Sequence, residues 1–77
     1  MGKAGDALKS VLDAYGITQY ALAKQMGIER NSLYRWVHSV RDPAADRVVE
    51  MVRALKAINP EAARAFIDRY LGNELDP

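Results

Sequence analysis

The stretch RNSLYRWVH, residues 30–38, groups polar side chains on one side of an expected helix. These side chains belong to Arg30, Asn31, Tyr34, Arg35 and His38. At about 100° per residue they cover an arc of about 140°, and no acidic residue lies among them. The opposite side is apolar, with Leu33, Trp36 and Val37. Because arginine can donate two hydrogen bonds to guanine and asparagine can pair with adenine, the polar side has the chemistry to contact base edges and phosphates.

The plain alternative is that this polar side is only a solvated helix surface. Exposed helices usually mix acids and bases three or four residues apart, as Glu50, Arg53 and Lys56 do farther along the chain. Charge is also unevenly distributed: residues 18–41 carry four basic side chains and one acidic one, whereas the whole chain has a net charge of only +1. The middle third can therefore bind a polyanion although the chain as a whole is nearly neutral.

The segments that must position this surface have helical periodicity, and none alternates like a strand. The pattern predicts five helices, at about residues 6–15, 19–26, 29–38, 43–58 and 60–71. Residues 72–77 form a short acidic tail. We therefore expect one all-α domain over residues 1–77, with its core at about 6–71.

Cap and turn residues separate these helices. The expected signals are Gly16, Thr18, Gly27, the pair Asp42–Pro43 and the pair Asn59–Pro60, with Asp42 and Asn59 as N-caps. Gly27 decides whether residues 19–37 form one helix or two, because a glycine inside a helix costs about 1 kcal/mol relative to alanine. Gly27 instead suits the left-handed end of a helix, with Ile28 filling the contact that accompanies it. Since Ala23 is small enough for two helices to cross closely, two short helices are expected.

The spaced residues Gln19, Ala23, Gly27 and Leu33 resemble the helix-turn-helix core of the lambda-repressor-like (XRE/Cro) DNA-binding domains. The resemblance extends from about Leu8 to Leu55 and includes the loop residue Pro43. It implies a five-helix lambda-repressor-like fold in which the second and third helices form the helix-turn-helix. It also implies that the third helix enters the major groove of DNA.

The resemblance assigns roles to individual residues. It implies base reading by Arg30, Asn31, Ser32 and Arg35, in the first turns of the third helix. It implies phosphate contacts by Gln19, Tyr34, His38 and Arg41, which position the domain without reading sequence. Many members have Glu-x-Gly where this chain has Val37 and Ser39, and the acid pairs with an arginine where this chain has Leu12. An apolar pair is a physically reasonable replacement for a buried ion pair.

The last helix has an apolar stripe wide enough for two surfaces. We expect one edge to pack on the domain and the other to form a homodimer interface with Phe66, Ile67, Tyr70 and Leu71. Repressors of the resembled family often pair in this region, so that two recognition helices meet successive major grooves about 34 Å apart on a palindromic operator. The alternative is that the whole stripe is used by the core of a single chain.

Three classes of function follow. The leading one is a sequence-specific, double-stranded DNA-binding transcriptional regulator, a repressor of bacterial or phage type. The second is a protein-interaction module, or an antitoxin with a separate toxin as its partner. An enzyme is not expected, because one histidine and no cysteine give no metal cluster or nucleophile–base pair, and no cofactor is expected. Without an apolar run near 20 residues or a signal-peptide core, we expect a soluble cytoplasmic protein with no membrane partner.

Overall fold

A computed structural model describes residues 3–38 and 41–74 of the chain. Over these residues the chain forms five α-helices and a final 3-10 turn, with no strand, which confirms the all-α class. The helices are α1 (Lys3–Tyr15), α2 (Gln19–Met26), α3 (Arg30–Val37), α4 (Ala45–Ile58) and α5 (Pro60–Leu71), followed by η1 (Gly72–Glu74).

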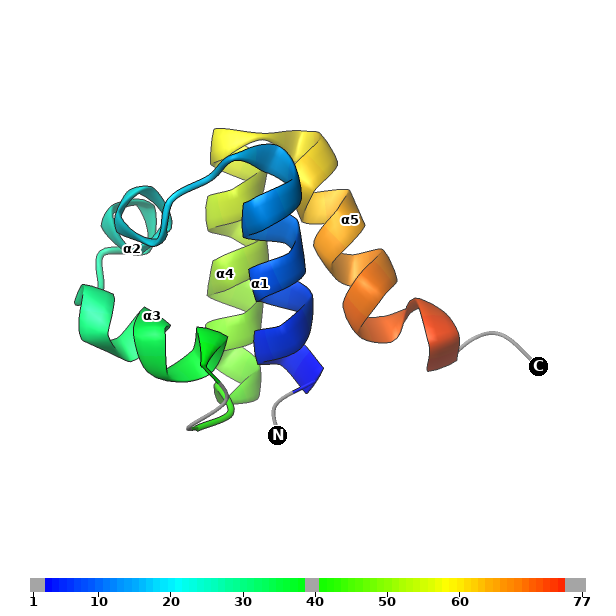
Figure 1. Cartoon of the computed structure of the whole chain (residues 1–77), viewed down its shortest axis with the longest axis horizontal. Helices are drawn as coiled ribbons and strands as arrows, with labels where there is room; N and C mark the ends of the chain where they lie inside the picture. Colours follow the sequence, from blue (N-terminus) through cyan, green and yellow to red (C-terminus); the bar gives the residue numbers. More distant parts are fainter. Residues whose placement is uncertain (1–2, 39–40, 75–77) are drawn as a thin grey trace.

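The helices are arranged so that α3 lies at an edge of the molecule (Figure 1). Helices α1 and α4 run through the centre, and α5 packs against both of them. On the other side, α2 contacts α4 and α3, while α3 also contacts α1. Helix α3 therefore has neighbours on its inner side and leaves its outer side open.

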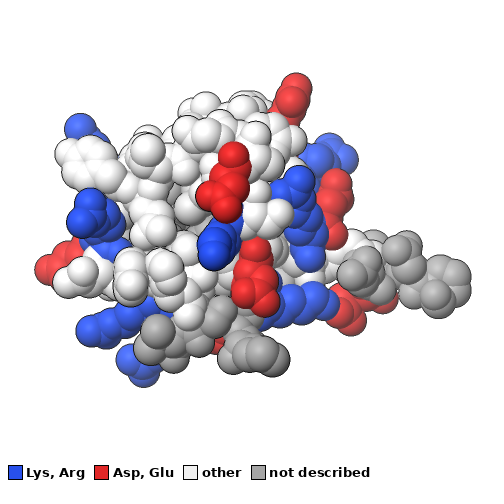
Figure 2. All heavy atoms as spheres, in the orientation of Figure 1, with Lys and Arg blue, Asp and Glu red and all other residues white. Residues whose placement is uncertain are grey.

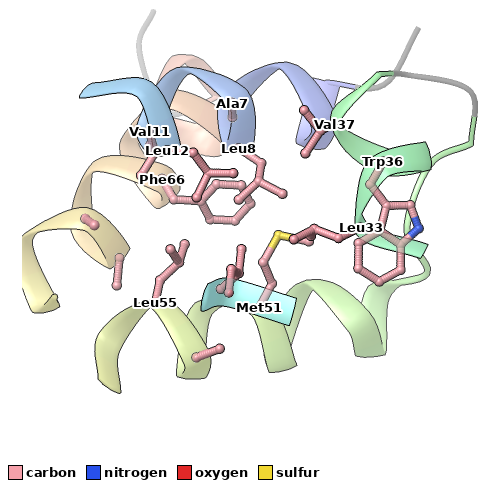
Figure 3. Close-up of a cluster of buried hydrophobic side chains, with 14 of the residues drawn as sticks. Ala7, Leu8, Val11, Leu12, Leu33, Trp36, Val37, Met51, Leu55 and Phe66 are labelled. Carbon is pink, nitrogen blue, oxygen red and sulfur yellow. The ribbon is translucent and has the colours of Figure 1, made fainter. Parts of the chain in front are cut away.

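One hydrophobic core joins all five helices (Figure 3). Its largest fully buried side chains are Leu8, Val11, Leu22, Leu33, Met51, Leu55 and Phe66. Leu33 of α3 points toward Met51 of α4, and Val37 points toward the first helix. Full burial of such a side chain contributes about 1.5–3 kcal/mol, so the apolar side of α3 fixes how this helix is rotated on the domain.

The boundary between α2 and α3 confirms the two-helix prediction. The Thr18 hydroxyl accepts a hydrogen bond from the Ala21 amide at 3.0 Å and so caps the start of α2. Gly27 has a φ of 73°, and its amide donates to the Lys24 carbonyl at 3.2 Å. The Ile28 amide donates to the Ala23 carbonyl at 3.1 Å, which completes a Schellman motif.

The starts of α1 and α4 differ from the sequence prediction. Helix α1 begins at Lys3 and not near residue 6, because Ala4 is buried and extends the apolar stripe by a turn. Alanine adds little to a hydrophobic pattern, so the pattern did not reveal this turn. Helix α4 begins at Ala45, and the predicted cap at Asp42 with Pro43 in the first turn is wrong.

The last helix begins as predicted and is linked to the first. The Asn59 side chain accepts from the Glu61 amide at 3.0 Å, and Pro60 is the first residue of α5. At the other end the chain continues past Leu71 into η1. The Arg69 guanidinium donates to the Ser10 hydroxyl at 2.6 Å. An ion pair between the ends of the described chain joins Lys3 to Glu74.

Candidate nucleic-acid interface

The polar side of α3 is exposed along its length. Arg30, Asn31, Tyr34, Arg35 and His38 are all exposed, and Ser32 is partly buried. The residues that alternate with them, Leu33, Trp36 and Val37, are all in the core. Three of the base-reading residues expected from the sequence, Arg30, Asn31 and Arg35, therefore lie on the outer side of a helix whose inner side is fixed by packing, and Ser32 lies between the two sides.

The segment after α3 brings two basic residues together. The Arg41 amide donates to the Arg35 carbonyl at 3.4 Å, so the chain folds back against the last turn of α3. One hollow is lined by both arginines together with Ser32 and Asp42. Asp42, expected to cap α4, thus lines the same hollow as two arginines. Arg41 is placed next to the expected base-reading residues, as a phosphate contact requires.

Gln19 lies at the start of α2 and next to both ends of α3. It lines one hollow with Arg30 and Tyr34, and a second hollow with His38. The positive end of a helix dipole favours an anion at this position. The four expected phosphate contacts, Gln19, Tyr34, His38 and Arg41, therefore border the same surface as the expected base-reading residues.

Two of the expected phosphate contacts, Tyr34 and His38, form a ring pair. The centroids of the Tyr34 and His38 rings are 3.9 Å apart, with an angle of 33° between the ring planes. They are one helical turn apart on the exposed side of α3. The two exposed rings therefore lie against each other at the end of the polar side.

The charges over this surface are mainly basic. Figure 2 shows mostly basic side chains at the edge that Figure 1 assigns to α2 and α3. The exposed acids nearest in sequence are Glu29 and Asp42, which precede and follow α3 and do not interrupt its polar side. A duplex that approached α3 would thus meet an arginine in the first turn and another in the last, with one acid before the helix and one after it.

Two departures from the resembled family have different outcomes in the structure. Leu12 and Val37 are both buried in the core, with 4% of each exposed, so an apolar pair is present where many relatives have an ion pair. Ser39 lies outside the described residues. The core of this chain therefore accommodates the first substitution without an unpaired charge.

The four residues expected at a dimer interface have different environments. Phe66 is fully buried inside the chain and has no surface to offer a second copy. Tyr70 is partly buried, and its ring stacks on that of Phe66 at 5.6 Å. Ile67 and Leu71 are 42% and 47% exposed, so they form the open edge of α5. The stripe thus serves mainly the core of the chain, with a narrow apolar edge left over.

Tyr20 was not predicted as part of this surface. It is 61% exposed and lines the hollow that contains Gln19, Arg30 and Tyr34. Its only sequence signal is its place directly after Gln19, and no periodicity places the starts of α2 and α3 side by side. It is the residue that the structure adds to the site.

A short helix that ends at a left-handed glycine, followed by a second short helix with an exposed basic side, defines a helix-turn-helix. A family model described as Helix-turn-helix matches residues 8–62. The chain therefore belongs to the XRE and lambda-repressor-like helix-turn-helix family and is a DNA-binding regulator. Searches of the curated proteins and of the solved structures return no significant match.

Membership of this family implies that the partner is double-stranded DNA. Proteins of the family are regulatory DNA-binding domains and are not usually enzymes. Within residues 3–38 and 41–74, no helix is both long and apolar enough to cross a membrane. The same residues contain no group of three or more histidine or acidic side chains that could hold a metal ion.

Proposed function

We propose that the chain is a sequence-specific repressor that inserts α3 into the major groove of its operator. The observation that supports this most directly is the division of α3 into a buried apolar side and an exposed side without acids. An α-helix fits the major groove, where each base pair presents a distinct pattern of donors and acceptors. A rigidly packed helix with exposed Arg30, Asn31 and Arg35 can distinguish such patterns.

The proposed contacts fall into two groups. Arg30, Asn31, Ser32 and Arg35 read base edges, and Gln19, Tyr34, His38 and Arg41 contact the sugar–phosphate backbone. The second group borders the first, as expected if phosphate contacts fix the position of the reading helix on the duplex.

We further propose that the repressor is a homodimer that binds a palindromic operator. The exposed Ile67 and Leu71, with part of Tyr70, give an apolar edge that a second copy can cover. Two-fold symmetry would present two copies of α3 to major grooves about 34 Å apart. A dimer on an operator then represses transcription by occupying DNA that the transcription machinery needs.

Selection from a pool of random duplexes tests this function. The expected result is enrichment of an inverted repeat whose half-sites are separated by about one helical turn. Enrichment of a single half-site would refute the dimer but keep sequence-specific binding. No enrichment of any sequence would refute the specific regulator and would favour the protein-interaction or antitoxin alternative.

Sedimentation of variants tests the proposed dimer edge. Ile67→Ser and Leu71→Ser should shift the protein toward the monomer, because each removes apolar area from the interface. Val49→Ser is the matched control, since Val49 is 50% exposed on α4 and lies off the proposed edge. Equal effects of all three substitutions would contradict the assignment of this edge.

A further inference from the structure

Two tyrosine rings flank a hollow between the starts of α2 and α3. Tyr20 is 61% and Tyr34 is 51% exposed, the highest values among the large hydrophobic side chains of the described residues. Both line the hollow, together with Thr18, Gln19 and Arg30. Two exposed tyrosines from different helices therefore border one space on the proposed DNA-binding surface.

Neither ring is needed by the fold. Both tyrosines lie outside the hydrophobic core of the described residues, and the only ring near that of Tyr34 belongs to His38, itself exposed. An exposed aromatic residue inside a helix also has a lower helix propensity than alanine. The core thus uses neither ring, and Tyr34 contacts a ring that is itself exposed, so both tyrosines keep apolar surface that a bound partner can cover.

The position of the hollow indicates which part of DNA would fill it. On one side is Gln19, at the start of α2, where a phosphate is expected. On the other side is Arg30, the first residue of α3, where a base edge is expected. In a DNA strand the group that joins the phosphate to the base is the deoxyribose, and its C–H groups provide an apolar surface.

We propose that this hollow receives one deoxyribose of each half-site, with the rings of Tyr20 and Tyr34 packed against the sugar. This inference rests on the proposed insertion of α3 into the major groove. It makes Tyr20 a positioning residue, which fixes the strand between its phosphate and the base that Arg30 reads. Because the contact is apolar and uncharged, it adds affinity without releasing counterions.

Hydroxyl-radical footprinting tests the proposal, because the radical attacks the sugar of each nucleotide. The wild-type chain, bound at saturation to its selected duplex, should protect one sugar next to the base contacted by Arg30. Tyr20→Ala should lose protection at that nucleotide alone, and Tyr20→Phe should keep it. Tyr20→Ala should also weaken binding by about 3- to 10-fold, with an unchanged dependence on salt.

The controls separate a local contact from a general loss. Helix content should be retained in Tyr20→Ala, since the residue is exposed and alanine is the better helix former. Val49→Ala, which truncates a side chain on α4 that is 50% exposed, should leave both footprint and affinity unchanged.

Several results would overturn the inference. An identical footprint for Tyr20→Ala and wild type would show that the ring does not cover a sugar. Equal loss of protection at all nucleotides would show a general effect on affinity. Deoxyuridine lacks the methyl group of thymidine. If replacing one thymidine by deoxyuridine weakened the binding of wild type as much as Tyr20→Ala does, and left the binding of Tyr20→Ala unchanged, the ring would contact a base methyl group instead of a sugar. A wild-type chain that protected no duplex would reject the proposed function itself.

Discussion

Arg30 and Asn31 are exposed because other residues of α3 pack into the core. Leu33 is fully buried and Trp36 nearly so, and their packing fixes the rotation of α3. A rotation of about 180°, half a turn of the helix, would move the arginine from the outer side to the place of the apolar side chains. The specificity of the proposed interface therefore depends on core residues as much as on the residues that touch DNA.

Substitution of the reading residues should change specificity position by position. Arg30→Ala and Asn31→Ala should each relax the preference at one base position, at a cost of about 1–3 kcal/mol for the preferred base, because a paired contact to a base edge is lost. Binding of a panel of operators with single base changes measures the effect.

Gln19→Ala provides the comparison for these two variants. Since Gln19 is proposed to contact a phosphate, its loss should weaken binding to all operators by a similar factor. If Gln19→Ala changed the base preference, or if Arg30→Ala weakened all operators equally, the assigned roles would be wrong.

At the scale of elements, the angle between α2 and α3 depends on Gly27. Its φ of 73° lies in the left-handed region, and a Cβ added there would meet no atom within 4 Å. The residue type at position 27 is therefore constrained by the backbone conformation and not by the space around it. The Schellman hydrogen bonds from Gly27 and Ile28 require that conformation, so the turn depends on a glycine at this position.

Gly27→Ala should destabilise the domain by about 1–2 kcal/mol, because alanine is strained in the left-handed conformation. For a chain of this size that is a fall in melting temperature of at least about 4 °C. Gly72→Ala is the matched control, since Gly72 has a φ of −57° in the right-handed helical region. It should be neutral or slightly stabilising, and a similar loss in both variants would contradict the account.

The elements also show how far sequence reasoning could go. Helix α2, the break at Gly27 and the start of α5 at Asn59–Pro60 were predictable because short-range cap chemistry determines them. The start of α4 was not, because Asp42–Pro43 carries the same local signal as Asn59–Pro60. In the structure, the Arg41 amide donates a hydrogen bond to the Arg35 carbonyl, a contact that the local sequence signal does not reveal.

The candidate site was predictable to a similar extent. The helical period was enough to place the polar side of α3, because all its residues belong to one short stretch of the chain. Tyr20 and the burial of Phe66 depend on how separate helices pack, and neither follows from periodicity. The spacing of apolar residues within one helix does not indicate which of these residues another helix covers.

At the scale of the whole molecule, contacts between α1 and the end of the chain close the domain. The ion pair of Lys3 with Glu74 and the hydrogen bond of Arg69 to Ser10 both join the first helix to the last segment. The hydrogen bond and the positive charge of Lys3 lower the pKa of Glu74 below its ordinary value of 4.5. Both side chains of the ion pair are exposed, so its contribution is small and is screened by salt.

This ion pair should give a small pH dependence to unfolding. Because the pKa of Glu74 is lower in the folded chain, its stabilisation is complete above the ordinary pKa of 4.5 and is lost as pH falls through the lowered value. Melting curves of wild type and Glu74→Gln at low salt should therefore differ near neutral pH and converge in acid. A difference that grew as pH fell would contradict this origin.

The most direct test of the central claim, that the α3 surface binds double-stranded DNA, is a salt titration of binding to the selected duplex. The logarithm of the affinity should fall linearly with the logarithm of salt concentration, with about one unit of slope for each phosphate that a basic side chain neutralises. Arg41→Ala should reduce that slope by about 1, whereas Lys56→Ala, near the end of α4 that leads to α5, should leave it unchanged. The account would be contradicted by an affinity that did not depend on salt. It would also be contradicted if Lys56→Ala reduced the slope and Arg41→Ala did not.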